Sequence, residues 1–169
     1  MNKSYTLTAD QQKTITLKKS GDYVVTLKGQ GSEATIKGAF WVKGTDTLNL
    51  NLTVIHAVPH TSANTVIKAV VDDSASATIN GTILVKKGAQ QTNSFLKENV
   101  LLLSKKARAE AVPNLEIEAN EVKCSHAATV GRVDPEQLFY LESRGLPQSK
   151  SKALIAQGFL SEVLESTHD

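Results

Sequence analysis

The feature that most constrains this 169-residue chain is the alternation of apolar and polar residues within short segments. Between Leu48 and Val54, four apolar residues alternate with asparagine and threonine, which is the period of a β-strand with one buried face. Similar extended segments recur at intervals of roughly a dozen residues as far as Gly131. The pattern predicts an all-β body over residues 1–131.

Two architectures fit such a series of strands, a sandwich and a solenoid, and periodicity alone does not separate them. Asn80-Gly81 suits a tight hairpin turn, whereas the turns at 28–31 and 43–46 suit the corners of a coil equally well. No exact repeat is visible. The segments predicted to be strands are 14–17, 23–27, 34–37, 39–42, 48–54, 66–71, 77–80, 82–85, 100–103, 115–117 and 122–130.

The pattern changes after Gly131, and residues 132–169 are predicted to form a helical segment. Asp134 followed by Pro135 is typical of a helix N-terminus, and Gly145 is a natural stop. A second helix is expected from about Pro147, because apolar residues from Ala153 to Leu164 recur at helical spacing; they are Ala153, Leu154, Ala156, Phe159, Leu160, Val163 and Leu164. Two short helices cannot bury their apolar faces alone, so they dock on the β-body or on a partner.

Cys124 is the only cysteine, and it lies two residues before His126 in a segment that alternates like a strand. Residues two apart in a strand point to the same face, so a thiolate and an imidazole face one way and can both bind a soft metal ion. This pair supplies only two of the four ligands of a tetrahedral site. Two other interpretations remain open, an inert buried cysteine and a Cys–His nucleophilic pair, and no protease signature supports the latter.

Two further histidines, His56 and His60, stand four residues apart across Pro59. This spacing suits a metal site on a helix, but the proline argues for a loop. We therefore expect a surface or turn role for both histidines.

Composition excludes several classes of function. The formal charge is +2, with scattered basic residues and few aromatic ones, so a nucleic-acid surface is not indicated. Apolar runs such as 100–103 are far too short to span a bilayer. A single cysteine and no signal-like segment near Met1 favour a reducing, cytoplasmic location.

Several blocks resemble, in the same order, the core region of the SufB/SufD family of the SUF iron–sulfur cluster assembly system. The blocks are 56–60, 79–85, 99–104, 109–117, 122–131 and 137–145. The resemblance implies a right-handed parallel β-helix followed by helices. It also implies dimerisation through the β-helix, as a homodimer or with a related SufB or SufD chain, and a partner similar to the ABC-type ATPase SufC that grips the helical segment.

The resemblance also implies roles for two residues. His126 matches a histidine, and Cys124 a cysteine, of the SufD cluster-building interface, where iron or an iron–sulfur cluster is held transiently. Residues 95–99 lack a cysteine found in SufB, and Ala127 replaces a SufB glutamate, so the chain is closer to SufD. Met1 and the extended start at Tyr5 favour a complete small protein.

The leading hypothesis is a non-enzymatic scaffold of iron–sulfur cluster assembly. The alternative is a structural or protein-binding β-solenoid that has lost cluster chemistry. Tyr140 and Arg144, four residues apart on one helical face, are the candidates for binding the ATPase.

Overall fold

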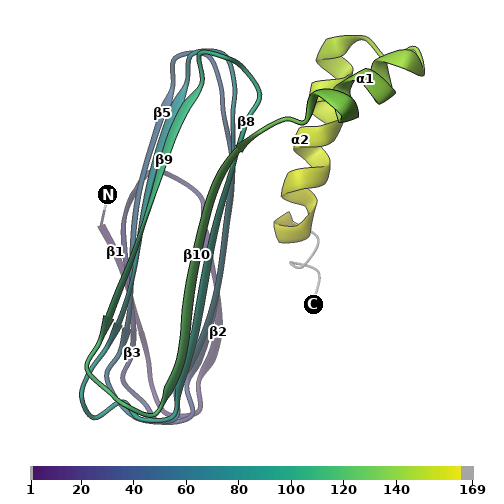
Figure 1. The fold of residues 1–169 in the computed structure, drawn as a ribbon. Coiled ribbons are helices and arrows are strands. Elements are labelled where there is room, and N and C mark those ends of the chain that lie inside the picture. The colour runs from purple at the N-terminus through teal and green to yellow at the C-terminus, as the bar shows by residue number, and fades with distance from the viewer. Residues whose placement is uncertain (1, 165–169) are drawn as a thin grey trace.

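The computed structural model describes residues 2–164, which form a parallel β-solenoid followed by two helices (Figure 1). The strands lie in two five-stranded sheets with the orders β1-β3-β5-β7-β9 and β10-β8-β6-β4-β2, which we call sheet A and sheet B. Each strand pairs in parallel with the strand two further along the chain. The solenoid prediction is confirmed, and the sandwich alternative is excluded because hairpin-connected strands would pair antiparallel.

Successive strands alternate between the two sheets. The strands are β1 (Asn2–Leu7), β2 (Gln12–Leu17), β3 (Gly21–Leu27), β4 (Glu33–Val42), β5 (Thr47–His56), β6 (Ser62–Val71), β7 (Ser76–Val85), β8 (Thr92–Leu102), β9 (Arg108–Ile117) and β10 (Val122–Arg132). The helices are α1 (Pro135–Ser143) and α2 (Gln148–Leu164). Residues 165–169 of the predicted helical segment lie outside the described residues.

The core lies between the two sheets and is built from ladders of inward-facing side chains. Thr47 pairs with Ser76, so equivalent residues of these neighbouring coils are 29 positions apart. Leu50 is fully buried against Ile79 in the next coil, as the alternation in 48–54 predicts. On the outer face, Asn51 donates to Asp22 at 2.6 Å. Stacked side chains thus stabilise the solenoid along both faces of sheet A.

Gly81 corrects the sequence prediction at one point. Asn80-Gly81 forms no hairpin but lies in the middle of the continuous strand β7, and the two predicted strands 77–80 and 82–85 are one. The inward position of Gly81 is occupied from the opposite sheet. A Cβ atom built there would lie 2.3 Å from Oε1 of Glu98, so the glycine accommodates a neighbouring side chain rather than a turn.

The corners leading into sheet B share one backbone conformation and one hydrogen-bond pattern. Asp10, Gly31, His60 and Gln91 all have positive φ. The backbone N–H of each donates to a carbonyl of the next coil, for example from His60 to Gln90 at 2.9 Å. His60 is exposed in this corner, which confirms its predicted turn role.

The two helices differ in how they contact the solenoid. Helix α1 begins as predicted, with the Asp134 carboxylate accepting the N–H of Glu136 at 2.9 Å, and buries none of its residues. Helix α2 packs on the outer face of sheet B over β4 and β6. Its buried Ala156 and Leu160 contact Val70 and Leu103. The expected apolar side of α2 is therefore only partly used, because Leu154 is half exposed.

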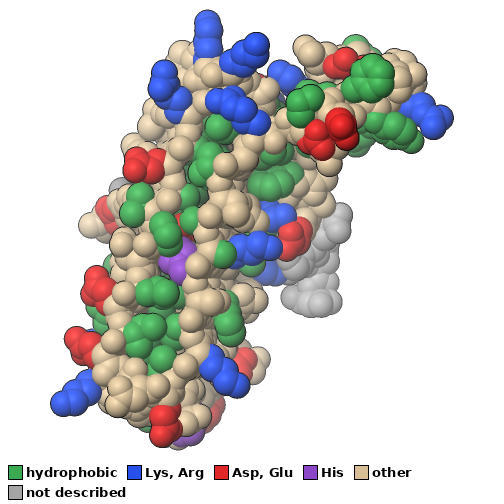
Figure 2. Space-filling model, viewed as in Figure 1, with side chains coloured by type: hydrophobic (Ala, Val, Ile, Leu, Met, Phe, Trp, Pro, Cys, Tyr) green, Lys and Arg blue, Asp and Glu red, His purple; other side chains and the backbone are tan. Residues whose placement is uncertain are grey.

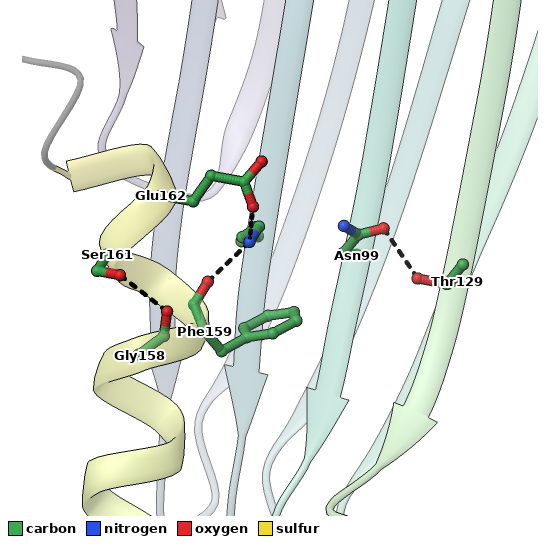
Figure 3. A network of polar contacts seen from close by, with 7 residues as sticks. Asn99, Thr129, Gly158, Phe159, Ser161 and Glu162 are labelled. Carbon is green, nitrogen blue, oxygen red and sulfur yellow. Dashed lines mark hydrogen bonds and ion pairs between the residues drawn. The ribbon is translucent and has the colours of Figure 1, made fainter.

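A buried lysine fastens the C-terminal half of α2 to the solenoid. Lys68 on β6 donates to the backbone carbonyl of Phe159 at 2.9 Å and forms an ion pair with Glu162 (Figure 3). Its ammonium also lies 4.8 Å from the centre of the Phe159 ring. Neither α1 nor α2, the two helices within 2–164, is long and apolar enough to cross a membrane.

Candidate functional site

Cys124 and His126 lie on β10, the edge strand of sheet B in the last coil. Both side chains point into the solenoid, while the adjacent residues Lys123 and Ser125 are exposed. The prediction that Cys124 and His126 share a face is therefore confirmed by the strand. Their roles stay predictions.

His126 contacts a carboxyl group that sequence reasoning missed. Its Nε2 atom lies 3.2 Å from Oε2 of Glu98, which comes from β8, one coil earlier. The side chains of both residues are almost entirely buried, at 2% and 0% exposure. The alternation of 92–102 would have placed Glu98 on the inner face, but this strand was predicted only from residue 100.

Glu98 occupies the space left open by Gly81. Its Oε2 atom contacts His126, whereas Oε1 has no hydrogen-bond partner among residues 2–164. Burial raises the pKa of Glu98 to about 8, because a charged carboxylate loses its hydration there. A carboxyl group in this position holds a proton near neutral pH unless a cation replaces it.

The imidazole of His126 is also incompletely satisfied. Nδ1 has no hydrogen bond of good geometry within the described chain. Burial lowers the pKa of His126, and the nearby backbone of Asn114 acts in the opposite direction. The neutral ring is thereby favoured, which is the form that binds metal ions.

Cys124 is partly buried and packs against the apolar core. Burial raises the pKa of its thiol, and the backbone of Ser94 opposes this effect. The cysteine therefore lacks the electropositive surroundings of a reactive thiolate, which argues against the nucleophilic interpretation. Within residues 2–164 no three Cys, His, Asp or Glu side chains are arranged to hold a metal ion.

His56 is a correction to the sequence prediction. It is not a surface residue but the fully buried last residue of β5. Its Nδ1 atom is hydrogen-bonded to Thr61 at 2.8 Å and its Nε2 atom to Ser94 at 2.9 Å. Pro59 does mark a corner, but the strand extends to His56 before the chain turns. Burial lowers the pKa of this histidine to about 4.

The last coil leaves apolar side chains exposed at the end of the solenoid. Leu115 and Ile117 on β9 and Val130 on β10 are each more than 40% exposed. Among residues 2–164, each of these two strands pairs with one neighbour only. Figure 2 shows hydrophobic side chains along the strip between β9 and β10, with a histidine among them. Such an edge can accept another chain.

The helix pair offers a second exposed surface, which includes the residues predicted for partner binding. Tyr140 is 57% exposed, and the guanidinium of Arg144 lies 5.3 Å from the centre of its ring. Helix α1, which carries Tyr140, contacts α2 more than it contacts any strand. Tyr140 also lines an open groove of about 560 Å³ with Leu141 and Ile155.

The fold, with titratable groups at one open end and a helix pair on one sheet, places the chain in the class of parallel β-solenoid proteins. Comparison with protein families narrows this class. Residues 11–159 match the family described as "SUF system FeS cluster assembly, SufBD core domain". The chain belongs to the SufBD family, as the resemblance indicated.

Curated relatives agree with this assignment. The chain is 38% identical over 138 residues to the iron–sulfur cluster assembly protein SufD of Bacillus subtilis (strain 168), a match covering 82% of the chain and 32% of the relative. It is 44% identical over 102 residues to SufD of Escherichia coli (strain K12), covering 60% and 24%. A SufBD family protein of Mycobacterium bovis is 36% identical over 163 residues, covering 89% and 41%. The chain thus spans less than half the length of these relatives.

Proposed function

We propose that this chain is a non-enzymatic scaffold of iron–sulfur cluster assembly that dimerises through its solenoid and binds an ABC-type ATPase similar to SufC through its helices. The observation that carries the proposal is the inward-facing pair Cys124 and His126 on the edge strand of the last coil. One chain supplies too few ligands for a cluster, so a second chain at this edge completes the set.

The exposed edge supports association at this place. Apolar side chains of β9 and β10 surround the end of the solenoid where the pair lies, and within the described residues both strands have no strand partner on one side. Association of two copies about a two-fold axis would bring two cysteines and two histidines to one interface.

The oligomeric state tests the dimer. We expect a dimer at tens of micromolar in light scattering, and Leu115→Glu should convert it to a monomer because a carboxylate is costly to bury. Leu154→Glu, on the exposed side of α2, is the matched control and should leave the dimer intact. A monomeric wild-type protein would contradict this part of the proposal.

Anaerobic incubation with ferrous iron and sulfide tests the cluster chemistry. We expect a stable visible chromophore in the wild type, its loss in His126→Ala and its weakening in Cys124→Ser. Metal analysis of the same samples measures the iron that each variant retains. A colourless wild-type product would reject the cluster function.

Co-purification with a SufC-like ATPase tests the helical surface. Replacing Tyr140 and Arg144 together with Ala should abolish binding, since aromatic and arginine side chains dominate such contacts. The β-rich circular dichroism spectrum should not change, because both residues are away from the core. Arg108→Ala on β9 is the control for loss of a surface arginine, and full retention by the double variant would exclude this site.

A second candidate function is a structural or protein-binding solenoid without cluster chemistry. One observation favours it: Cys124 packs against the core, and burial raises the pKa of its thiol. Under this alternative, Cys124→Ser buries a hydroxyl and lowers the free energy of unfolding by about 1–3 kcal/mol without changing metal content. Thermal melts and metal analysis of that variant separate the two functions.

A further inference from the structure

Glu98 and His126 carry more hydrogen-bonding atoms than their surroundings pair. Oε1 of Glu98 is buried and lacks a hydrogen-bond partner among residues 2–164, and Nδ1 of His126 is buried without a hydrogen bond of good geometry there, although the backbone of Asn114 lies near the ring. Buried polar atoms of native proteins are nearly always paired, so such exceptions point to a missing water, ion or ligand. An unpaired carboxyl oxygen next to an incompletely paired imidazole marks this pair as a candidate site.

The space around the carboxyl group is also unusual. Gly81 removes the side chain that would otherwise face Glu98 from sheet A, and any Cβ there would collide with Oε1. Leu96 lines the same position. Strand β7 therefore lacks an apolar side chain at its centre, where the acid of Glu98 lies instead. Replacing a buried ion pair by apolar residues is often neutral or stabilising, so stability alone does not account for this arrangement.

The separation of the two facing atoms suits a shared metal ion. Two ligand atoms each about 2.1 Å from one ion, at angles of roughly 90–109°, lie about 3.0–3.4 Å apart. The Nε2 atom of His126 and the Oε2 atom of Glu98 are 3.2 Å apart, a distance that also fits the direct hydrogen bond between them when no ion is present. Imidazole and carboxylate are also ligands that ferrous iron accepts.

We propose that Glu98 and His126 together form a two-ligand half-site for ferrous iron inside the last coil of the solenoid. The assignment deepens the proposed function and rests on it for the identity of the metal. It changes the expected ligand set, because the side chain in contact with Nε2 of His126 is that of Glu98. Cys124 then enters when a cluster is completed with a second chain, not when iron alone is bound.

The half-site lies next to the edge strand of the last coil. His126 is on β10, the last strand of sheet B in the described chain, and Glu98 lies one coil further in. The ring of His126 therefore stands between Glu98 and the open end.

Anaerobic equilibrium dialysis with ferrous iron alone tests the half-site, and cobalt(II) absorption provides a second readout of the ligand type. Glu98→Gln and His126→Ala should each weaken iron binding at least about tenfold, since even indirect partners of metal ligands contribute that much. Cys124→Ser should bind iron as tightly as the wild type. Glu116→Gln, on the exposed face of β9, is the control for loss of a carboxylate and should also bind normally.

Glu98→Gln keeps the shape of the side chain, and circular dichroism establishes that it folds. Glu98→Asp is a second variant that retains the carboxyl group but shortens its reach, and its affinity should fall between those of the wild type and Glu98→Gln. Wild-type affinity in Glu98→Gln would overturn the assignment. A thiolate-to-cobalt band that persists in Glu98→Gln and disappears in Cys124→Ser would also overturn it.

The result is distinguishable from that of the cluster experiment. If the wild type forms a chromophore with sulfide but Glu98→Gln binds iron with wild-type affinity, the half-site is rejected and the proposed function remains intact. Iron binding that depends on Glu98, without any chromophore in the wild type, supports the half-site and rejects the cluster function.

Discussion

Strands β4 and β8 belong to the same sheet and have the same backbone pairing, yet they fill the interior differently. The inward positions of β4 carry buried apolar residues, among them Ile36 and Phe40. The inward positions of β8 include the buried polar residues Thr92, Ser94 and Glu98. The interior thus changes from apolar to partly polar along the solenoid.

This difference teaches that the solenoid separates backbone stability from interior chemistry. Each coil forms the same parallel ladder of hydrogen bonds whatever its side chains are, so one coil can carry polar groups while its neighbours supply apolar burial. Polar side chains in the interior weaken a fold unless they are satisfied. Ser94 is satisfied by its hydrogen bond with His56, whereas Oε1 of Glu98 has no hydrogen-bond partner among residues 2–164.

The largest expected effect tests the apolar region. Ile36→Ala should lower the free energy of unfolding by about 2–5 kcal/mol, because it removes a fully buried side chain and leaves a cavity. Denaturant unfolding measures this loss. Val130→Ala, at an exposed position of β10, should cost far less. Equal losses of unfolding free energy for the two variants would show that the side chain of Val130 is buried rather than exposed.

A pH-dependent effect tests the polar part of the interior, to which His56 belongs through its hydrogen bond with Ser94 of β8. His56 is neutral when folded because its pKa is about 4, whereas the unfolded residue titrates near 6.5. The unfolded state therefore binds more protons between these values, and stability present above pH 6.5 is lost as pH falls toward 4. We expect a loss of about 3 kcal/mol from this residue, in proportion to the shift of its pKa.

Denaturant unfolding of the wild type and of His56→Gln across this range isolates that contribution. Glu98 has the opposite sign, since its raised pKa favours the folded state at low pH, but it is present in both proteins and cancels in the comparison. Parallel pH profiles of the two proteins would show that His56 does not carry the effect.

A smaller effect is expected at a buried polar residue of β6, a strand whose other inward positions are apolar. Thr65 on β6 is buried, and its hydroxyl has no hydrogen-bond partner in the described residues. Thr65→Val keeps the shape and removes the unsatisfied group, so it should raise the free energy of unfolding by about 1–2 kcal/mol. A lower melting temperature for Thr65→Val would mean that the hydroxyl is satisfied, for example by a water molecule.

The smallest effect concerns the outer ladder of sheet A. Asn51 donates to Asp22 and accepts from Asn80, but all three side chains are in contact with water. Asn51→Ala should change the free energy of unfolding by less than about 0.5 kcal/mol. A loss above about 1 kcal/mol in denaturant unfolding would show that the outer ladder contributes as much as a buried hydrogen bond.

Much of the architecture could be predicted from local patterns. The alternation in 48–54 defines a half-buried strand, and Asp134 with Pro135 defines the start of α1, because both depend only on neighbouring residues. The continuous strand through Gly81 could not be predicted. The reason for that glycine is Glu98, which comes from the other sheet.

The candidate site shows the same limit. Strand periodicity was sufficient to place Cys124 and His126 on one face. The contact between His126 and Glu98 joins residues 28 positions apart and depends on the register of successive coils, which no local pattern reveals. His56 was misassigned for a related reason, since its partner Ser94 is 38 residues away.

The unequal corners have a consequence for how such a chain can diverge. Thr47 pairs with Ser76 and Ser76 with Arg108, so the offset between neighbouring coils changes from 29 to 32 residues while the strands stay aligned. The corners absorb the extra residues. Insertions and deletions there leave every ladder in register, so the lineage can lose all visible repetition in its sequence while each coil keeps its place in the stack.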